Sequence, residues 1–416
     1  MLRKLRTDPL ARASLLAVVS RFGNVFVSLV TGIVVARTLG PEGKGALAYL
    51  TTAVNLVARA VCCGLESAFT RFHRVKGVPA GRAAGSVVWT VLGLGGAGAA
   101  AVLVLLHLWP GLAASVPMVL ARAYFWALPA FLFLFVLGPI LYGLRAEAAF
   151  GLLELTMRLV MLAATVAVVG SAWNTLLTVG LLQLAPYLAA AVVGFILLRA
   201  KVSGPLTWDA SIVRAMIGAA PGVYTYNTVR YGLGYGSLLL AAQFLTVADA
   251  GLYSVASMLG ESVTLLATSI NMAFYPAVSA VAEPGRYARR ITLAVMALCV
   301  AGGAALVFVS SWLVPRIYGA AFAPAVPLFA ALLPGVVLLG GEQVLGSLFV
   351  AAGRPAPANT GVLVGLIALP LLAAWLTPTH GLYGLAIASS ISQAIAAAIA
   401  AGMYWRHRAS FTAPLT

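Results

Sequence analysis

The chain has 416 residues, of which 62% are hydrophobic and only 9% are charged, and its formal net charge is +16. Its mean hydropathy of +1.02 excludes a soluble globular protein, because no single core of this size buries so much apolar surface. Lipid is therefore the expected solvent for most of the chain.

Apolar segments long enough to cross a bilayer as a helix, about 20 residues each, follow one another along the whole chain. In chain order the twelve segments cover residues 14–36, 46–70, 85–108, 119–142, 151–170, 175–198, 213–240, 251–279, 290–313, 324–351, 359–377 and 381–404. These segments are too long for membrane β-strands, and apolar and polar residues do not alternate along them as they do in a β-barrel. The basic start is typical of a signal peptide, but Arg21 interrupts the apolar run, so we expect a retained first helix.

Basic residues gather on alternate loops, with 18 of the 26 lysines and arginines assigned to one side of the membrane. The opposite side receives Arg37, Lys44, Arg122 and Arg316. By the positive-inside rule, both termini are expected in the cytoplasm, where the surplus charge faces anionic lipid head groups. A nucleic-acid partner is excluded, because the sequence has no soluble domain to carry a basic face.

The two halves of the sequence are related by an offset of 206 residues, which aligns Gly45 with Gly251. An even number of spans separates equivalent helices, so the repeats are parallel, about an axis along the membrane normal. We therefore expect two six-helix lobes, residues 1–200 and 201–416, around a central cavity that holds the substrate site.

Polar residues recur at matched positions of the first and seventh helices. The offset places Arg21 on Asn227 and Asn24 on Arg230, so that each half contributes one arginine and one asparagine, one turn apart. Arg21 lies about two turns, or roughly 10 Å, from the cytoplasmic end, where snorkelling to the surface is the alternative explanation.

The second and eighth helices each carry a polar stripe at helical spacing. The stripes are Asn55, Arg59, Glu66 and Thr70 on the former, and Ser257, Glu261, Thr264, Thr268, Asn271 and Tyr275 on the latter. Such faces avoid lipid; they either join helices to one another or line a hydrated cleft. In the second interpretation the cavity residues are Arg21, Asn24, Asn55, Arg59, Asn227, Arg230, Glu261, Thr264, Thr268 and Asn271.

Arginines grouped in a closed site indicate a substrate with phosphate or carboxylate groups, since guanidinium binds both through paired hydrogen bonds. Glu66 and Glu261 either neutralise the nearby arginines or bind H⁺ or Na⁺ and couple transport to an ion gradient. Helix 7 combines Pro221 with several glycines and is the best candidate for a bending element.

Signals for catalysis and metal binding are missing from the sequence. Residues 93–98 match G-x-G-x-x-G but lie in an apolar span without a preceding strand, which favours close helix packing. Cys62, Cys63 and Cys299 are expected to be buried free thiols, and no metal-ligand spacing or nucleophile–base set occurs. We therefore expect no enzyme and no cofactor; a membrane glycosyltransferase or polymerase would need a larger outer polar loop.

Two stretches carry a family resemblance. SLLAVVSRFGNVFVSLVTGIVVARTLGPEGKGALAYLTTAVNLVARAVCCGLESAFTRF resembles the first two helices of bacterial oligosaccharide and polysaccharide flippases of the multidrug/oligosaccharidyl-lipid/polysaccharide exporter superfamily. IYGAAFAPAVPLFAALLPGVVLLGGEQVLGSLFVAAGRP is similar to the tenth helix of that family. With twelve spans in two lobes, as in its multidrug (MATE) branch, the resemblance covers nearly the whole chain.

The resemblance implies a flippase of the bacterial inner membrane. It would move a polyprenyl-diphosphate-linked glycan to the outer leaflet by alternating access, with the diphosphate on Arg21, Arg59 and Arg230. Polysaccharide polymerase and glycosyltransferases would be its partners in the cell. A drug/cation antiporter of the same fold, and a flippase for another anionic lipid-linked precursor, remain the alternatives.

Overall fold

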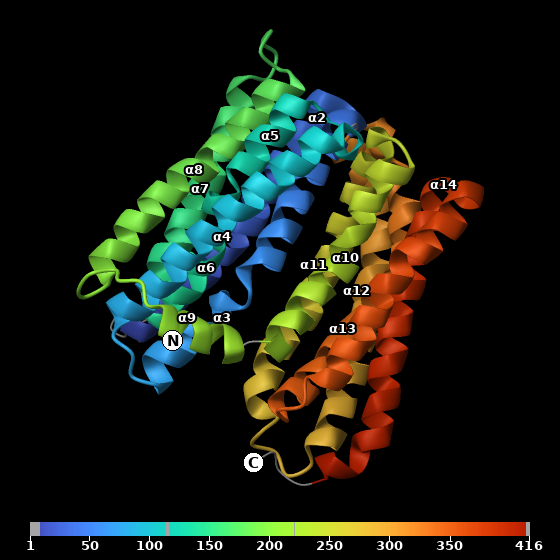
Figure 1. Cartoon of the computed structure of the whole chain (residues 1–416). Coiled ribbons are helices and arrows are strands. Elements are labelled where there is room, and N and C mark those ends of the chain that lie inside the picture. The colour runs from blue at the N-terminus through green and yellow to red at the C-terminus, as the bar shows by residue number, and fades with distance from the viewer. Residues whose placement is uncertain (1–8, 114–115, 220, 413–416) are drawn as a thin grey trace. The chain divides into compact units, whose positions relative to one another are not determined.

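The computed structural model describes residues 9–113, 116–219 and 221–412. All regular structure within these residues is helical, which confirms the predicted fold class. The chain forms two compact units: residues 1–39 with 53–221 are unit 1, and residues 40–52 with 222–416 are unit 2 (Figure 1). The expected division of the repeats between residues 200 and 201 stays a prediction.

Unit 1 contains most of the first two predicted spans and all of the next four. Its helices are α2 (Pro9–Cys62, apart from residues 40–52), α3 (Leu65–Thr70), η1 (Arg71–Val75), α4 (Ala80–Leu108), η2 (Pro110–Ala113), α5 (Met118–Trp126), α6 (Leu128–Gly143), α7 (Glu147–Ala167), α8 (Leu176–Lys201) and α9 (Ala210–Ala219). Helix α6 packs against α3, α4 and α8. Gly95, in the glycine run of α4, lies against the backbone of Pro129, so the prediction of close helix packing there is confirmed.

Unit 2 is built around α13. Its helices are α10 (Pro221–Phe244), α11 (Val247–Ala277), α12 (Pro284–Ile317), η3 (Ala320–Phe322), α13 (Ala325–Ala351), α14 (Ala356–His407) and η4 (Arg408–Phe411). Helices α11, α12 and α14 all pack against α13, and Figure 1 shows them side by side. Glu342, near the centre of α13, is therefore buried.

Eight helices among the described residues are long and apolar enough to span a membrane, or nine with the pair α5 and α6, which is bent by 43°. Two of the eight, α2 and α14, each contain a break, at Gly40 (φ 67°) and Gly381 (φ 55°), where glycine tolerates the left-handed backbone. Treating each as two spans and adding α10 accounts for all twelve predicted segments. The protein is therefore a multi-pass membrane protein.

The seventh predicted segment, 213–240, is helical at all of its described residues. Helix α9 ends at Ala219 and α10 begins at Pro221; residue 220, between them, lies outside the described residues. The boundary between the two units follows directly, between Pro221 and Gly222.

Residues 40–52 pack within unit 2 through a reciprocal glycine contact. A Cβ at Gly45 would overlap the carbonyl oxygen of Val247, and a Cβ at Gly251 would overlap the carbonyl oxygen of Pro41. Positions 45 and 251 differ by 206, as do 41 and 247, so each glycine meets the residue four places before its counterpart. The contact agrees with the repeat offset predicted from the sequence.

The cysteines are free, as predicted, but they differ in burial. Cys62 and Cys299 are buried, whereas Cys63 is half-buried. Cys63 has a left-handed backbone (φ 52°) and lies, with Gly64, between α2 and α3. The prediction of three buried thiols is therefore wrong at Cys63, because the helix is interrupted there.

Candidate functional site

Arg230 joins α10 to α13 in unit 2. Its Nε donates a hydrogen bond to Oε2 of Glu342 at 3.2 Å. Its Nη2 donates to the carbonyl oxygen of Leu339 at 3.1 Å and to Oε1 of Gln343 at 3.3 Å. The three acceptors lie within one turn of α13, so the guanidinium fixes the position of α10 against the central helix of the unit.

Glu342 is the buried member of this ion pair. Its side chain has no exposed surface, whereas that of Arg230 is 17% exposed. The second carboxylate oxygen, Oε1, accepts a hydrogen bond from the hydroxyl of Tyr226 at 2.9 Å. Gly346 makes room for this hydroxyl, since a Cβ there would overlap it. A carboxylate removed from water is stable only when it is paired in this way.

The polar stripe of α11 meets this network at one point. The hydroxyl of Thr268 donates to Oε1 of Gln343 at 3.5 Å, whereas that of Thr264 bonds within its own helix to the carbonyl of Gly260 at 3.1 Å. Oδ1 of Asn271 is buried without a hydrogen-bond partner among the described residues. Asn227, on α10, is exposed. Arg230 and Thr268, both predicted site residues, therefore share Gln343 as a partner.

Glu261, on the same stripe, belongs to a second polar group of unit 2. Its carboxylate accepts a hydrogen bond from Tyr235, and its charged partner is Lys44. Lys44 lies in the segment 40–52, which packs in unit 2. The expectation that Glu261 neutralises an arginine of the cavity stays a prediction; the charge that acts on its carboxylate within unit 2 is that of Lys44.

The predicted site residues of unit 1 have environments of their own. The guanidinium of Arg59 lies over the ring of Phe135, 4.7 Å from its centroid. Asn24 is buried, and its Oδ1 has no hydrogen-bond partner in the described part of the chain. Glu66 accepts a hydrogen bond from the thiol of Cys62 at 3.1 Å.

Two further predicted residues of unit 1 complete the set. Asn55 is half-buried, and the side chain of Arg21 lies outside the described residues. The convergence of arginines from the two halves on one cavity stays a prediction.

The family is decided by sequence comparison. A family model described as polysaccharide biosynthesis protein matches residues 34–327, more than half of the chain. The chain belongs to this polysaccharide biosynthesis family. A search of curated proteins returned no match at a significant level.

Solved structures similar to this member of the polysaccharide biosynthesis family are membrane transporters. An inward-facing multidrug resistance MATE family transporter of the MOP superfamily has a TM-score of 0.74 at 13% identity, covering 93% of this chain and 95% of the other. The lipid II flippase MurJ, in an inward closed conformation, has a TM-score of 0.72 at 14% identity, covering 96% and 90%. The MATE multidrug transporter DinF-BH in complex with R6G has a TM-score of 0.69 at 17% identity, covering 97% and 96%. These similarities establish the fold.

Sequence reasoning missed Glu342 and Gln343, which bind Arg230, and Tyr226, which bonds to Glu342. For the first two a signal was present, because GGEQ places an acid and an amide inside an otherwise apolar span, where polar residues are rare. The pairing of Glu342 and Gln343 with α10, a helix more than a hundred residues earlier, needed the structure. The described residues contain no group of three metal-ligating side chains, and coupling to H⁺ or Na⁺ stays a prediction.

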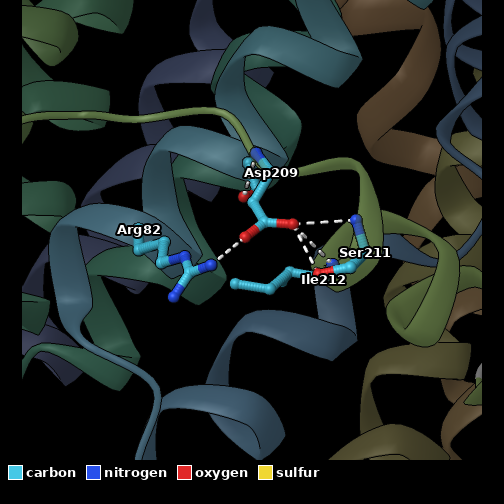
Figure 2. A network of polar contacts seen from close by, with 5 residues as sticks. Arg82, Asp209, Ser211 and Ile212 are labelled. Carbon is cyan, nitrogen blue, oxygen red and sulfur yellow. Dashed lines mark hydrogen bonds and ion pairs between the residues drawn. The ribbon is translucent and has the colours of Figure 1, made fainter.

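A second ion pair fixes the connector after α8 to unit 1 (Figure 2). Arg82, on α4, forms a salt bridge with Asp209, whose other carboxylate oxygen accepts hydrogen bonds from the hydroxyl of Ser211 at 2.6 Å and from its backbone N–H at 2.8 Å. The backbone N–H of Ile212 bonds to the same oxygen at 3.3 Å. The bonds from Ser211, and then from Arg82, hold the pKa of Asp209 well below its ordinary value.

Further bonds hold the connector along α4. The indole N–H of Trp89 donates to the carbonyl of Leu206 at 2.9 Å, and that of Trp208 donates to the hydroxyl of Thr90 at 3.0 Å. A Cβ at Gly85 would come within 2.5 Å of the carbonyl oxygen of Thr207. The connector therefore belongs to unit 1 up to the start of α9.

Proposed function

We propose that the protein moves a polyprenyl-diphosphate-linked oligosaccharide from the inner to the outer leaflet of the bacterial inner membrane by alternating access. The diphosphate binds to arginines of the transporter, the glycan passes through a hydrated cleft, and the prenyl chain stays in lipid. Both termini lie in the cytoplasm. Glycosyltransferases supply the cargo, and a polysaccharide polymerase uses it.

The observation that carries this proposal is Arg230, an arginine whose side chain is 17% exposed, inside a membrane protein of a polysaccharide biosynthesis family. A guanidinium binds a diphosphate through parallel charge-assisted hydrogen bonds, which are stronger than neutral ones. A charge within the membrane is costly and marks a functional pathway when it is retained. Membership of the family supports a lipid-linked glycan as cargo, and the similarity in fold to MurJ, a lipid II flippase, supports the same class.

The test replaces the ion pair as a unit. In Arg230→Met/Glu342→Gln the guanidinium and its counter-charge disappear together, so no unpaired buried charge remains. We expect surface polysaccharide export to fall at least about tenfold, because losing one charge-assisted bond removes about 1.5–3 kcal/mol. Membrane insertion should stay at the level of the original protein.

The matched control is Arg316→Ala, which removes an exposed arginine at the end of α12 and should leave export unchanged. Arg21→Ala and Arg59→Ala are expected to reduce export as well. Normal export by the paired variant, with normal protein levels, would exclude Arg230 from cargo binding.

A cation antiporter is the second candidate, and Glu261 favours it. Its carboxylate, bonded to Tyr235, is the type of group that binds an organic cation or a coupling proton. In an antiporter, Glu261→Gln would abolish drug efflux while the paired variant at Arg230 and Glu342 would transport normally. In a flippase, the paired variant is the more damaging of the two.

A further inference from the structure

The ion pair in unit 2 is open on one side only. Glu342 has no exposed side-chain surface, and both of its oxygens are used, Oε2 by Arg230 and Oε1 by Tyr226. Arg230 keeps 17% of its side chain exposed. Arg230 is therefore the member of the pair whose side chain an external ligand can reach.

The guanidinium also retains hydrogen-bonding capacity. The bonds to described residues use Nε and Nη2, and a guanidinium has five N–H donors in a planar fork. An anionic ligand that binds Arg230 must compete with Glu342 for the positive charge of the guanidinium.

Competition with a tethered carboxylate selects ligands by charge. Glu342 is held at contact distance, so its effective concentration is far above that of any dissolved monoanion. A phospholipid with one negative charge offers no more charge than the carboxylate it would replace, and it leaves a buried acid unpaired, which is strongly unfavourable. A diphosphate brings additional charge and additional acceptors, which form more bonds to the fork.

We propose that Glu342 is a specificity residue that screens Arg230 against the monoanionic phospholipids of the bulk membrane, so that only a lipid with a diphosphate group displaces it. The inference rests on the proposed function, since it gives Arg230 a diphosphate cargo. Such screening has a clear use, because anionic phospholipids vastly outnumber any lipid-linked precursor and would otherwise compete with it for the arginine.

The experiment measures binding of farnesyl diphosphate to the full chain in nanodiscs, with phosphatidylglycerol either absent or making up half of the lipid. The unchanged protein should bind with the same affinity in both membranes. Glu342→Gln should bind about tenfold more tightly without phosphatidylglycerol, because the tethered competitor is gone. It should lose about tenfold or more when phosphatidylglycerol is present, because the guanidinium is now available to monoanions.

Gln343→Ala is the matched control, since Gln343 also bonds to Arg230 but carries no charge. This variant should remain insensitive to phosphatidylglycerol. If Glu342→Gln does not fold, Tyr226→Phe serves in its place: it releases one oxygen of Glu342 and should give a smaller gain of phosphatidylglycerol sensitivity in the same direction.

The outcomes separate the two proposals. The screening role would be overturned if phosphatidylglycerol already weakened binding of farnesyl diphosphate to the unchanged protein. It would also be overturned if phosphatidylglycerol did not weaken binding to the folded Glu342 and Tyr226 variants. Either result would leave diphosphate transport intact. Failure of the unchanged protein to bind farnesyl diphosphate in either membrane, or equal binding by Arg230→Met/Glu342→Gln, would overturn the proposed function itself. Screening by Glu342 is supported only by the pattern in which sensitivity appears when the carboxylate is removed.

Discussion

The ion pair of unit 2 and the ion pair of the connector in unit 1 join the same two chemical groups with different consequences. Arg230 and Glu342 are 17% and 0% exposed, whereas Arg82 and Asp209 are 54% and 16% exposed. Water screens the connector pair and can replace either partner, whereas water does not reach the side chain of Glu342 to replace its partner. We therefore expect burial, more than the distance between the charges, to decide how much a salt bridge contributes to stability.

The largest effect is expected from breaking the buried pair on one side. Arg230→Met leaves the Glu342 carboxylate without its cation and should lower the free energy of unfolding by about 3–5 kcal/mol. Arg230→Met/Glu342→Leu removes both charges and should recover most of that loss. Equilibrium unfolding in mixed micelles measures both variants. Equal stability of the single and the double variant would mean that the Glu342 carboxylate is not buried away from water.

The next effect tests the space around Glu342. Gly346→Ala places a methyl group where the Tyr226 hydroxyl lies, and overpacking of this kind destabilises by about 1–3 kcal/mol. Gly402→Ala, on α14, meets nothing within 4 Å and should be neutral or stabilising by up to about 1 kcal/mol. The same unfolding assay compares them, and equal values for the two variants would contradict this packing.

A smaller and local effect is expected at the connector. Arg82→Ala should leave global unfolding almost unchanged, because the bonds of Trp89 and Trp208 still hold the segment on α4. Amide hydrogen exchange in residues 203–209 should become faster. Unchanged exchange there would show that the salt bridge adds nothing to these indole bonds.

The connector pair also has a pH dependence of known sign. The pKa of Asp209 in the folded protein lies below its ordinary value of 3.8. Its stabilising contribution is therefore complete above about pH 4 and is lost as the pH falls through the lower, folded value. At neutral pH, protonation of Asp209 should not affect amide hydrogen exchange in residues 203–209. Below about pH 4 the exchange rate in the original protein should rise relative to the rate in Asp209→Asn. An acceleration near neutral pH would contradict the assignment.

The smallest effect is expected at Glu283 and Arg286, an ion pair with both side chains more than half exposed. Arg286→Ala should leave the free energy of unfolding and polysaccharide export within experimental error. A loss of stability as large as that expected for Arg230→Met would refute the link between the burial of an ion pair and its contribution to the free energy of unfolding.

Much of the fold follows from the sequence because it depends on local properties. Apolar length alone located the twelve spans, and the offset of 206 paired Gly45 with Gly251 before their contact was known. Hydropathy did not distinguish a half-buried Cys63 from a buried one, because the positive φ at that residue is a backbone property.

The site was less accessible from sequence because its pairings are tertiary. The pattern identified Arg230 and Thr268 as polar residues of two helices, but Glu342 lies on a third, and nothing local connects it to α10. Lys44 was assigned to a loop by charge placement, and its relation to Glu261 depends on which unit residues 40–52 join. The spacing of polar residues along one helix predicts which face of the helix is polar. Which helix packs against that face depends on the tertiary fold.

The glycine contact has a consequence for the origin of the chain. Gly45 rests on Val247 and Gly251 rests on Pro41, a self-complementary arrangement in which each side offers the same surface, as at the interface of a two-fold symmetric homodimer. A half-length ancestor that met a copy of itself would make both parts of this contact with one set of residues. Fusion after gene duplication would then have tethered an interface that already existed, leaving each copy free to acquire its own charges.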